Sequence, residues 1–178
     1  MFDMSVKIRR ATADDADGLG RVHADAWLEA YGDLFAVGFL QEAAERRRRA
    51  WPGHFANPSG LGSLLLVAVE PVDDADLPVA FLNAGPNEQL SGMQEVLAFY
   101  AHPDAWGTGA AATLMRRGLE HLAESGDREA VLWTLAGAGR ARRFYEKNGW
   151  RLADGHRTRD FGDGRELPLV EYRHWLLQ

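Results

Sequence analysis

Two glycines in a stretch of small residues give this sequence its clearest chemical signal. Gly107 and Gly109 stand between the apolar run Glu95–Ala101 and a helical pattern that begins near Gly109. Glycines leave the backbone uncovered, and the N–H groups at the start of a helix lie at the positive end of its dipole. Such a turn can bind phosphate, although glycines in the same pattern also serve ordinary strand-to-helix connections.

A tyrosine further along the chain belongs to a segment that should lie beside this turn. In residues 141–150, helical spacing puts Ala141, Phe144 and Tyr145 on one side, and Gly149 can end the helix in the left-handed conformation. Ligands of α/β sheets bind beyond the carboxyl ends of parallel strands, where this helix and the glycine turn would both lie. The Tyr145 phenol either projects over that crevice or is a core tyrosine with a bonded hydroxyl.

An aromatic stripe on an early helical segment offers further candidates. His23, Trp27 and Tyr31 recur at four-residue spacing and therefore share one face of a helix. The stripe is either core packing with satisfied polar tips or the wall of a substrate pocket. Trp27 and Tyr31 are retained as candidate substrate-binding residues.

The elements that must position these groups follow from periodicity and turn residues. The pattern predicts strands over 6–10, 64–69, 78–85, 95–101, 131–135, from 150 onward and over 167–176. It predicts helices over 14–31, 39–51, 109–125 and 139–147. Thr12 and Asp15 resemble a capping box, and Pro52 with Gly53 is expected to end the second helix.

The element order βααβββαβαββ predicts one domain over residues 1–178 of the α/β (α+β) class, with a mixed, mostly antiparallel sheet flanked by helices. A right-handed crossover would lay 131–135 parallel to 95–101. With 46% hydrophobic residues among 178, the chain can bury a sizeable core.

Composition excludes several classes of function. A net charge of −6 argues against nucleic-acid binding, and Arg46–Arg49 reads more simply as a solvated helix end than as a phosphate-binding patch. The chain has no cysteine, no signal-peptide pattern and no apolar run long enough to span a membrane. A soluble, cytoplasmic protein is expected. The six histidines show no metal-ligand spacing and no GxSxG occurs, so neither a metal site nor a serine hydrolase is predicted.

Two motifs together resemble a known family. His-Pro-Asp-Ala-Trp-Gly-Thr-Gly-Ala-Ala at 102–111 and Ala-x-x-Phe-Tyr-Glu-Lys-x-Gly-Trp at 141–150 look like the GNAT superfamily of N-acetyltransferases. The chain between Gly109 and Tyr145 has room for one helix, one strand and the start of another helix, as in that family. The stripe His23, Trp27 and Tyr31 also resembles the first helix of many small bacterial members. The resemblance covers nearly the whole chain.

The resemblance implies transfer of an acetyl group from acetyl-CoA to a primary amine, of a small molecule or of a protein, by direct attack in a ternary complex. Backbone N–H groups of the glycine turn would hold the pyrophosphate, and the pantetheine arm would pair with the preceding strand. A backbone N–H of that strand could also polarise the thioester carbonyl. The cofactor-binding residues implied are Phe99, Tyr100, Ala101, Trp106, Gly107, Thr108, Gly109, Ala110, Ala111 and Ala138.

The catalytic residues implied are a general acid and a general base. Tyr145 matches the tyrosine that gives a proton to the departing thiolate, and a phenol with a reference pKa of about 10 is protonated at neutral pH. Glu95 matches a glutamate that deprotonates the amine in some members. The alternatives for Glu95 are a surface residue at the end of a strand, with water as the base.

Two positions depart from the family pattern. Trp106 stands where Gln or Arg is usual, so a side-chain contact to the pyrophosphate is missing or is made by the indole N–H. Ala138 stands where many members have Asn near the pantetheine. These departures favour the alternative of a non-catalytic acyl-CoA sensor or interaction module, whereas Tyr145 and Glu95 favour an enzyme.

The acceptor amine is not identified by the sequence. Its pocket is expected between the first two helices and a loop around residues 156–164, and acidic groups such as Asp33 and Asp160 would favour a cationic amine. The last strands could pair between two subunits, which would give a homodimer.

Overall fold

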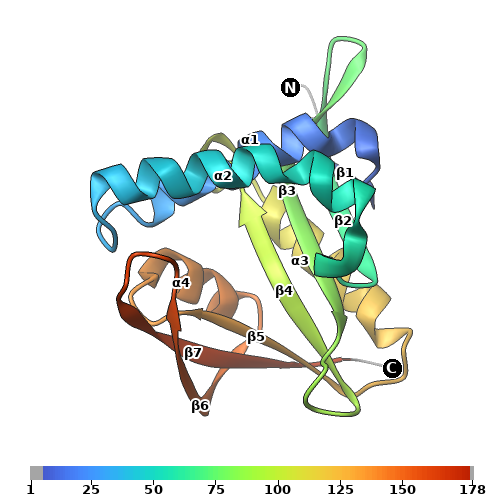
Figure 1. Ribbon diagram of the computed structural model, residues 1–178. Helices are drawn as coiled ribbons and strands as arrows, with labels where there is room; N and C mark the ends of the chain where they lie inside the picture. Colours follow the sequence, from blue (N-terminus) through green and yellow to red (C-terminus); the bar gives the residue numbers. More distant parts are fainter. Residues whose placement is uncertain (1–5, 177–178) are drawn as a thin grey trace.

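The computed structural model describes residues 6–176, which form a seven-stranded mixed sheet with helices on both faces (Figure 1). The strands are β1 (Lys7–Arg10), β2 (Leu64–Val72), β3 (Ala75–Pro86), β4 (Met93–Ala101), β5 (Glu129–Leu135), β6 (Arg151–Asp160) and β7 (Glu166–Trp175). The helices are α1 (Ala16–Ala30), α2 (Val37–Ala56), α3 (Ala110–Ala123) and α4 (Gly139–Lys147). Their order confirms the predicted fold class. Within residues 6–176, no helix is long and apolar enough to cross a membrane.

The sheet is covered on both faces because alternate strand residues point in opposite directions. Helices α1 and α2 lie across one face, where Leu19 and Val22 of α1 pack in one buried cluster with Phe81 of β3. Helix α3 lies behind the sheet in Figure 1, and its Leu114 packs with Leu82, the neighbour of Phe81, in a second cluster. These two layers fix β2, β3 and β4 as a rigid unit.

The sheet divides between its fourth and fifth strands. The strand order is β1-β2-β3-β4-β5-β7-β6, and β4 and β5 form the only parallel pair within residues 6–176, as predicted. That pairing runs from Met93–Glu129 to Val96–Leu132 and stops there. The next residue, Leu97, is an extra residue in β4 opposite β3, which is a β-bulge. Because bulges bend and twist a strand, β4 and β5 leave this point in different directions (Figure 1).

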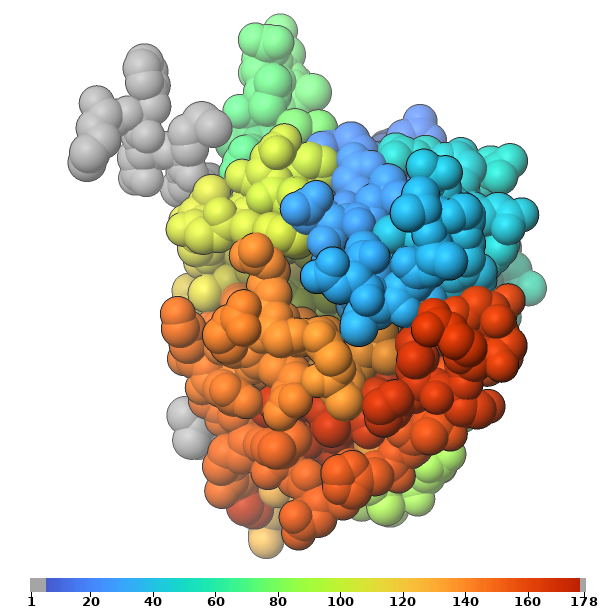
Figure 2. All heavy atoms as spheres, turned by 90° about the vertical axis from the view of Figure 1, so that its left-hand side faces the viewer, coloured from blue at the N-terminus to red at the C-terminus, as the bar shows by residue number. Residues whose placement is uncertain are grey.

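The half of the sheet beyond the split is closed against the helices by the turn between β6 and β7. Arg165 in that turn donates a hydrogen bond to the carbonyl of Leu34 at 2.9 Å and forms an ion pair with Asp163. Figure 2 shows the red-orange surface of this turn against the blue surface of the connection between α1 and α2. The predicted loop begins only at Phe161, because residues 156–160 pair with β7 as part of β6.

Helix α2 continues for another turn past Pro52, so the prediction that Pro52 and Gly53 end it is wrong. Proline cannot donate to the carbonyl four residues earlier, that of Arg48. This carbonyl oxygen faces Gly20 of α1, where an added Cβ would lie 2.4 Å away from it. The close approach of α1 and α2, together with the buried ring of Trp51, holds the last turn in place despite the missing bond.

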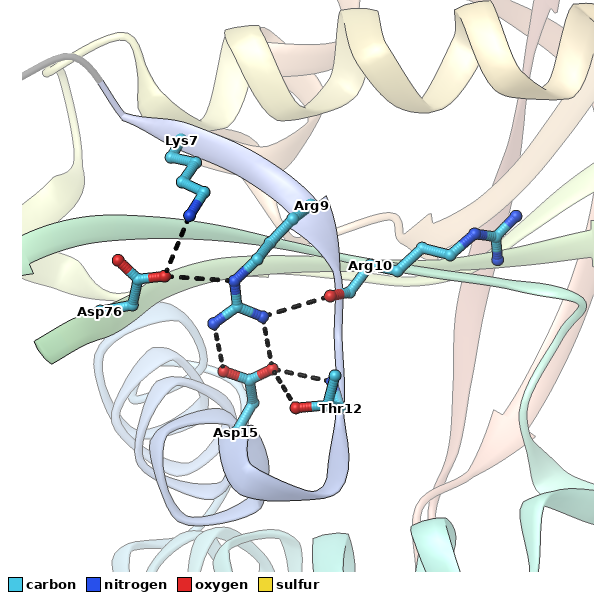
Figure 3. Close-up of polar contacts among 6 residues, drawn as sticks. All are labelled: Lys7, Arg9, Arg10, Thr12, Asp15 and Asp76. Atoms are coloured by element: carbon cyan, nitrogen blue, oxygen red, sulfur yellow. Dashed lines mark hydrogen bonds and ion pairs between the residues drawn. The ribbon is translucent and has the colours of Figure 1, made fainter.

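The first strand is tied to the first helix by a buried ion pair (Figure 3). Both guanidinium NH₂ groups of Arg9 donate to the Asp15 carboxylate, at 2.7 and 2.8 Å. The same carboxylate accepts the Thr12 backbone N–H at 2.8 Å, which confirms the predicted capping box. Burial disfavours the charged Asp15, but Arg9 and Thr12 outweigh it and lower the pKa of this carboxyl. Arg9 also meets Asp76 at 3.3 Å at a more exposed position.

Replacing Asp15 with asparagine should destabilise the protein by about 2–3 kcal/mol, because a part-buried guanidinium loses its bidentate partner. Asp76→Asn is the matched control, and loss of its exposed pair should cost less than about 1 kcal/mol. Urea unfolding at pH 7 measures both free energies. Equal losses in the two variants would contradict the assignment of Asp15 as the residue that fastens β1 to α1.

Candidate active site

The split between β4 and β5 opens into two cavities. One has a volume of about 490 Å³ and is bounded by the start of α3 and by α4. The other has a volume of about 110 Å³ and is bounded by β5 and β6. Four residues line both cavities: Tyr31, Phe99, Tyr100 and Tyr145. The cavities therefore approach each other at one point, from opposite sides of the sheet's dividing line.

The glycine turn forms one end of the larger cavity. Gly107 and Gly109 have φ angles of +80° and +93°, a conformation that side-chain-bearing residues rarely adopt. An added Cβ at either position would meet nothing within 4 Å, so the backbone is open on that side. In the first turn of α3, the N–H groups of Ala111 and Ala112 have no preceding helical carbonyls as partners. The turn therefore presents uncovered donors at the positive end of a helix, as predicted.

Trp106 has a structural role in this turn. Its indole N–H donates to the carbonyl of Ala101 at 2.9 Å, which leaves no indole donor for a ligand. The guanidinium carbon of Arg140, at the start of α4, lies 4.2 Å from the centre of the Trp106 ring. Arg140 lines the larger cavity. Arg140 thus brings a positive charge to the glycine turn, which has no basic residue of its own.

The free edge of β4 supplies backbone donors to the split. The N–H of His102, just after β4, bonds to the carbonyl of Val79 at 2.8 Å and so points toward β3. Since successive residues of an antiparallel strand alternate between its two neighbours, the peptide groups of Phe99 and Ala101 point the other way, toward the split. Among the strands of residues 6–176, none pairs with them there, because the pairing with β5 ends at Val96.

Tyr145 lies where the two cavities approach each other. It is 7% exposed, and its ring lies between those of Phe99 and Tyr172, with centres 6.4 and 5.8 Å away. Burial, and then the neighbouring phenols of Tyr100 and Tyr172, raise the pKa of its hydroxyl above 10. No hydrogen bond joins this hydroxyl to another group of residues 6–176. Tyr145 is therefore protonated at neutral pH and retains a proton to donate.

Helix α4 is anchored so that Tyr145 keeps this position. The hydroxyl of Tyr172 on β7 donates to Glu146 at 2.7 Å and accepts a hydrogen bond from Arg142 at 3.1 Å. Arg142 also donates to the carbonyl of Ala136, just before the helix. Gly149 has a φ of +84° and ends the helix as predicted. Arg142 and Glu146 lie on either side of Tyr145 in α4, so the two hydrogen bonds to Tyr172 fix this part of the helix against β7.

Glu95 lines the smaller cavity, on the opposite side of the split from the glycine turn. Its carboxylate accepts a hydrogen bond from the Asn87 side chain at 2.8 Å. Burial raises the pKa of Glu95, Glu88 raises it further, and Arg157 and Asn87 oppose the shift. A carboxylate with a raised pKa is a stronger proton acceptor than an ordinary glutamate.

Most of the predicted site residues line a cavity, and three do not. The larger cavity is lined by Phe99, Tyr100, Ala101, Trp106, Gly107, Gly109, Ala111 and Ala138 from the predicted set. Thr108 instead donates to the carbonyl of Ala105 and accepts the N–H of Ala110, so these two residues shape the turn. Trp27 is 1% exposed, and its indole N–H donates to the hydroxyl of Tyr100 at 3.2 Å. It supports the site from behind, whereas Tyr31 reaches both cavities.

Cationic residues at both cavities were not predicted. Arg140, Arg143 and Lys147 line the larger cavity from α4. Their spacing of three and then four residues places them on one helix face, a signal that was available in the sequence. Arg157 and Arg159 line the smaller cavity from one face of β6. Within residues 6–176, no group of three or more His, Cys, Asp or Glu side chains is arranged to hold a metal ion.

Similarity to known proteins agrees with this geometry. The sequence profile of the acetyltransferase (GNAT) family matches residues 24–150. No curated protein matches the chain.

Several solved structures share the fold. PaiA N-acetyltransferase from Thermoplasma acidophilum, in complex with coenzyme A, has 19% identity and a TM-score of 0.72 over 97% of this chain and 99% of its own. YncA from Salmonella typhimurium, with its cofactor acetyl-CoA, has 17% identity and a TM-score of 0.65 over 98% and 95%. The ribosomal-protein-alanine N-acetyltransferase from Brucella melitensis has 21% identity and a TM-score of 0.64 over 96% and 99%.

Proposed function

The chain belongs to the acetyltransferase (GNAT) family, and on this premise we propose that it transfers the acetyl group of acetyl-CoA to a primary amine by direct attack in a ternary complex. The observation that carries the proposal is the split between β4 and β5. It joins a cavity with uncovered backbone donors to a cavity with a carboxylate, and Tyr145 lines both. A donor and an acceptor entering from opposite sides would meet beside its hydroxyl.

The larger cavity suits the donor. A diphosphate needs several convergent hydrogen-bond donors, which the turn at Gly107 and Gly109 and the start of α3 supply without a basic surface. Arg140 adds the charge that Trp106 lacks. The N–H and carbonyl of Phe99 and the N–H of Ala101 can pair with the pantetheine amides as an added strand would. Acetyl-CoA, when bound, supplies the thioester.

Starting from an ammonium, the chemistry removes two protons from the nitrogen and delivers one to the sulfur. Glu95 accepts a proton from the attacking ammonium, directly or through water, and frees the nitrogen lone pair. The nitrogen–carbon bond then forms as the carbon–sulfur bond breaks, and the nitrogen releases its second proton to water to give the neutral amide. An N–H of Phe99 or Ala101 stabilises the negative charge on the carbonyl oxygen, and Tyr145 gives its hydroxyl proton to the departing thiolate.

Tyr145→Phe tests the proposed acid. The variant keeps the buried ring but cannot donate a proton, so kcat should fall about 100-fold or more. The dissociation constant of CoA, measured by calorimetry, should stay within about twofold of the parent value. Thiol release with a panel of amines reports the rate. An unchanged rate would remove Tyr145 from the mechanism, and CoA binding with no acetylation of any amine by the parent would favour a non-catalytic acyl-CoA-binding protein.

The pH profile tests the proposed base. As the pH falls through the raised pKa of Glu95, the carboxylate gains a proton and can no longer accept one from the amine. The acid limb of kcat/KM in the parent should therefore have a pKa above the ordinary glutamate value of about 4.3. In Glu95→Gln this limb should be absent, and the plateau value of kcat/KM should be about 100-fold lower than in the parent.

Glu88→Gln is the matched control for Glu95. Glu88 raises the pKa of Glu95 by charge repulsion, so its removal should move the acid limb to lower pH and leave the plateau unchanged. A limb that stays in place in both variants would mean that another group, or water alone, accepts the proton.

Arg140→Gln tests the donor end. Loss of one charge-assisted contact to a phosphate should weaken CoA binding about tenfold and make the affinity less sensitive to salt. The rate at saturating acetyl-CoA should change little. Arg116→Gln removes an equal charge from the exposed surface of α3, where Arg116 pairs with Glu120, and should leave CoA affinity unchanged. If both substitutions weakened CoA binding equally, Arg140 would act only through the overall charge of the protein and not through contact with a phosphate.

A further inference from the structure

Two guanidinium groups line the smaller cavity, and a third lies within range of charge interaction with one of them. Arg157 and Arg159 line it from β6. Arg47 of α2 does not line the cavity but is close enough for charge interaction with Tyr31, Tyr100 and Arg159. Positive charge is thus concentrated at one cavity of a chain whose net charge is −6.

Each of these guanidinium groups stands over an aromatic ring instead of a carboxylate. The Arg157 group lies 4.2 Å from the centre of the Trp133 ring, the Arg159 group 5.0 Å from that of Phe161, and the Arg47 group 3.3 Å from that of Trp27. Within residues 6–176, none of the three arginines forms an ion pair, although Arg47 donates one N–H to the carbonyl of Ala43 in its own helix at 2.9 Å. A guanidinium that stacks on a ring keeps its N–H edge available for a ligand.

The like charges repel one another, and those of Arg47 and Arg157 are partly desolvated. Burial comes first in lowering the pKa values of both Arg47 and Arg157, and Arg159 adds to the shift of each. Glu95 and Glu171 oppose the shift of Arg157. Among the described residues that line the cavity, Glu95 is the single carboxylate. One carboxylate facing several cations leaves an excess of positive charge that a bound anion would neutralise.

The acidic residues expected to attract a cationic amine are engaged elsewhere. One carboxylate oxygen of Asp160 accepts the backbone N–H groups of Gly162, Asp163 and Gly164 in the turn after β6. Asp33 lines a separate hollow beside Phe39. Neither lines the smaller cavity, where Glu95 is the lining carboxylate and Glu171 acts on Arg157 from outside the lining.

We propose that the acceptor is a small amine that carries its own anionic group, a carboxylate or a phosphonate, which Arg157 and Arg159 bind while Glu95 receives the ammonium. Arg47 adds positive charge from outside the lining. The cavity volume of about 110 Å³ suits the polar end of a small amino acid. This inference rests on the proposed acetyl transfer and names the class of molecule that the transfer would use.

Matched pairs of acceptors test the inference. Glycine and β-alanine are compared with glycinamide and β-alaninamide, which differ from them mainly in charge, and aminomethylphosphonate distinguishes a phosphonate from a carboxylate. The value of kcat/KM should be at least tenfold higher for the anionic member of each pair. The amides have the less basic nitrogen and so more free amine at neutral pH, which works against the expected preference.

Arginine variants show whether the preference comes from this cavity. Arg159→Gln and Arg157→Gln should lower kcat/KM for the acids about tenfold or more and for the amides about twofold or less. Arg151→Gln removes a charge from the same strand outside the cavity, where Arg151 lies over Trp175, and should change neither. The shift in melting temperature caused by CoA confirms that each variant is folded.

Each outcome separates this inference from the proposed function. Acetylation of the amides equal to that of the acids, or a preference that persists in both arginine variants, overturns the anionic acceptor and leaves the acetyl transfer standing. If no amine is acetylated, the transfer fails, and calorimetric titration of the CoA-saturated protein decides the rest. Binding of the acids and not of the amides, lost in Arg159→Gln, still supports the anion site, and absence of binding overturns it.

Discussion

The separation of β4 from β5 is the constraint on which the rest of the structure depends. A central strand normally satisfies its backbone groups on both edges, but β4 does so with β5 only from Met93 to Val96. The bulge at Leu97 bends the strand while its pairing with β3 continues to Ala101. Backbone donors therefore face a cavity in the middle of a sheet, and these donors are available because no neighbouring strand uses them.

The split persists because each half of the sheet is fixed by different contacts. The half that contains β4 is held between α1 and α3 by the residues around Phe81 and Leu82. In the other half, β5 pairs with β7 along its whole length. The hydrogen bonds of Tyr172 on β7 hold α4 against this half. Arg165 then joins the turn after β6 to the connection between α1 and α2. Closing the split would require one of these contacts to break.

Local signals in the sequence predicted the fold and much of the site, because local chemistry determines them. The positive φ angles of Gly107 and Gly109 and the end of α4 at Gly149 follow from what glycine alone tolerates. Pro52 misled for the opposite reason, since packing against Gly20 outweighs the local cost of proline in a helix. The spacing of Arg140, Arg143 and Lys147 on one helix face was visible in the sequence, but the contact of Arg140 with Trp106 was not, because the two residues are distant in the chain.

The arginines of the smaller cavity were missed because a contact such as that of Arg157 with Trp133 joins residues distant in sequence. These contacts also indicate how an acidic protein can keep cations available. Carboxylates outnumber basic side chains in this chain, 26 to 20, so an arginine beside one would be neutralised. Aromatic faces hold a guanidinium without occupying its N–H donors. Trp106 does this for Arg140 at the proposed donor end, and Trp133 does it for Arg157 at the proposed acceptor end. The placement of these two tryptophans therefore leaves Arg140 and Arg157 without a carboxylate partner among the described residues at the two cavities, which neither net charge nor the basic residues alone reveal.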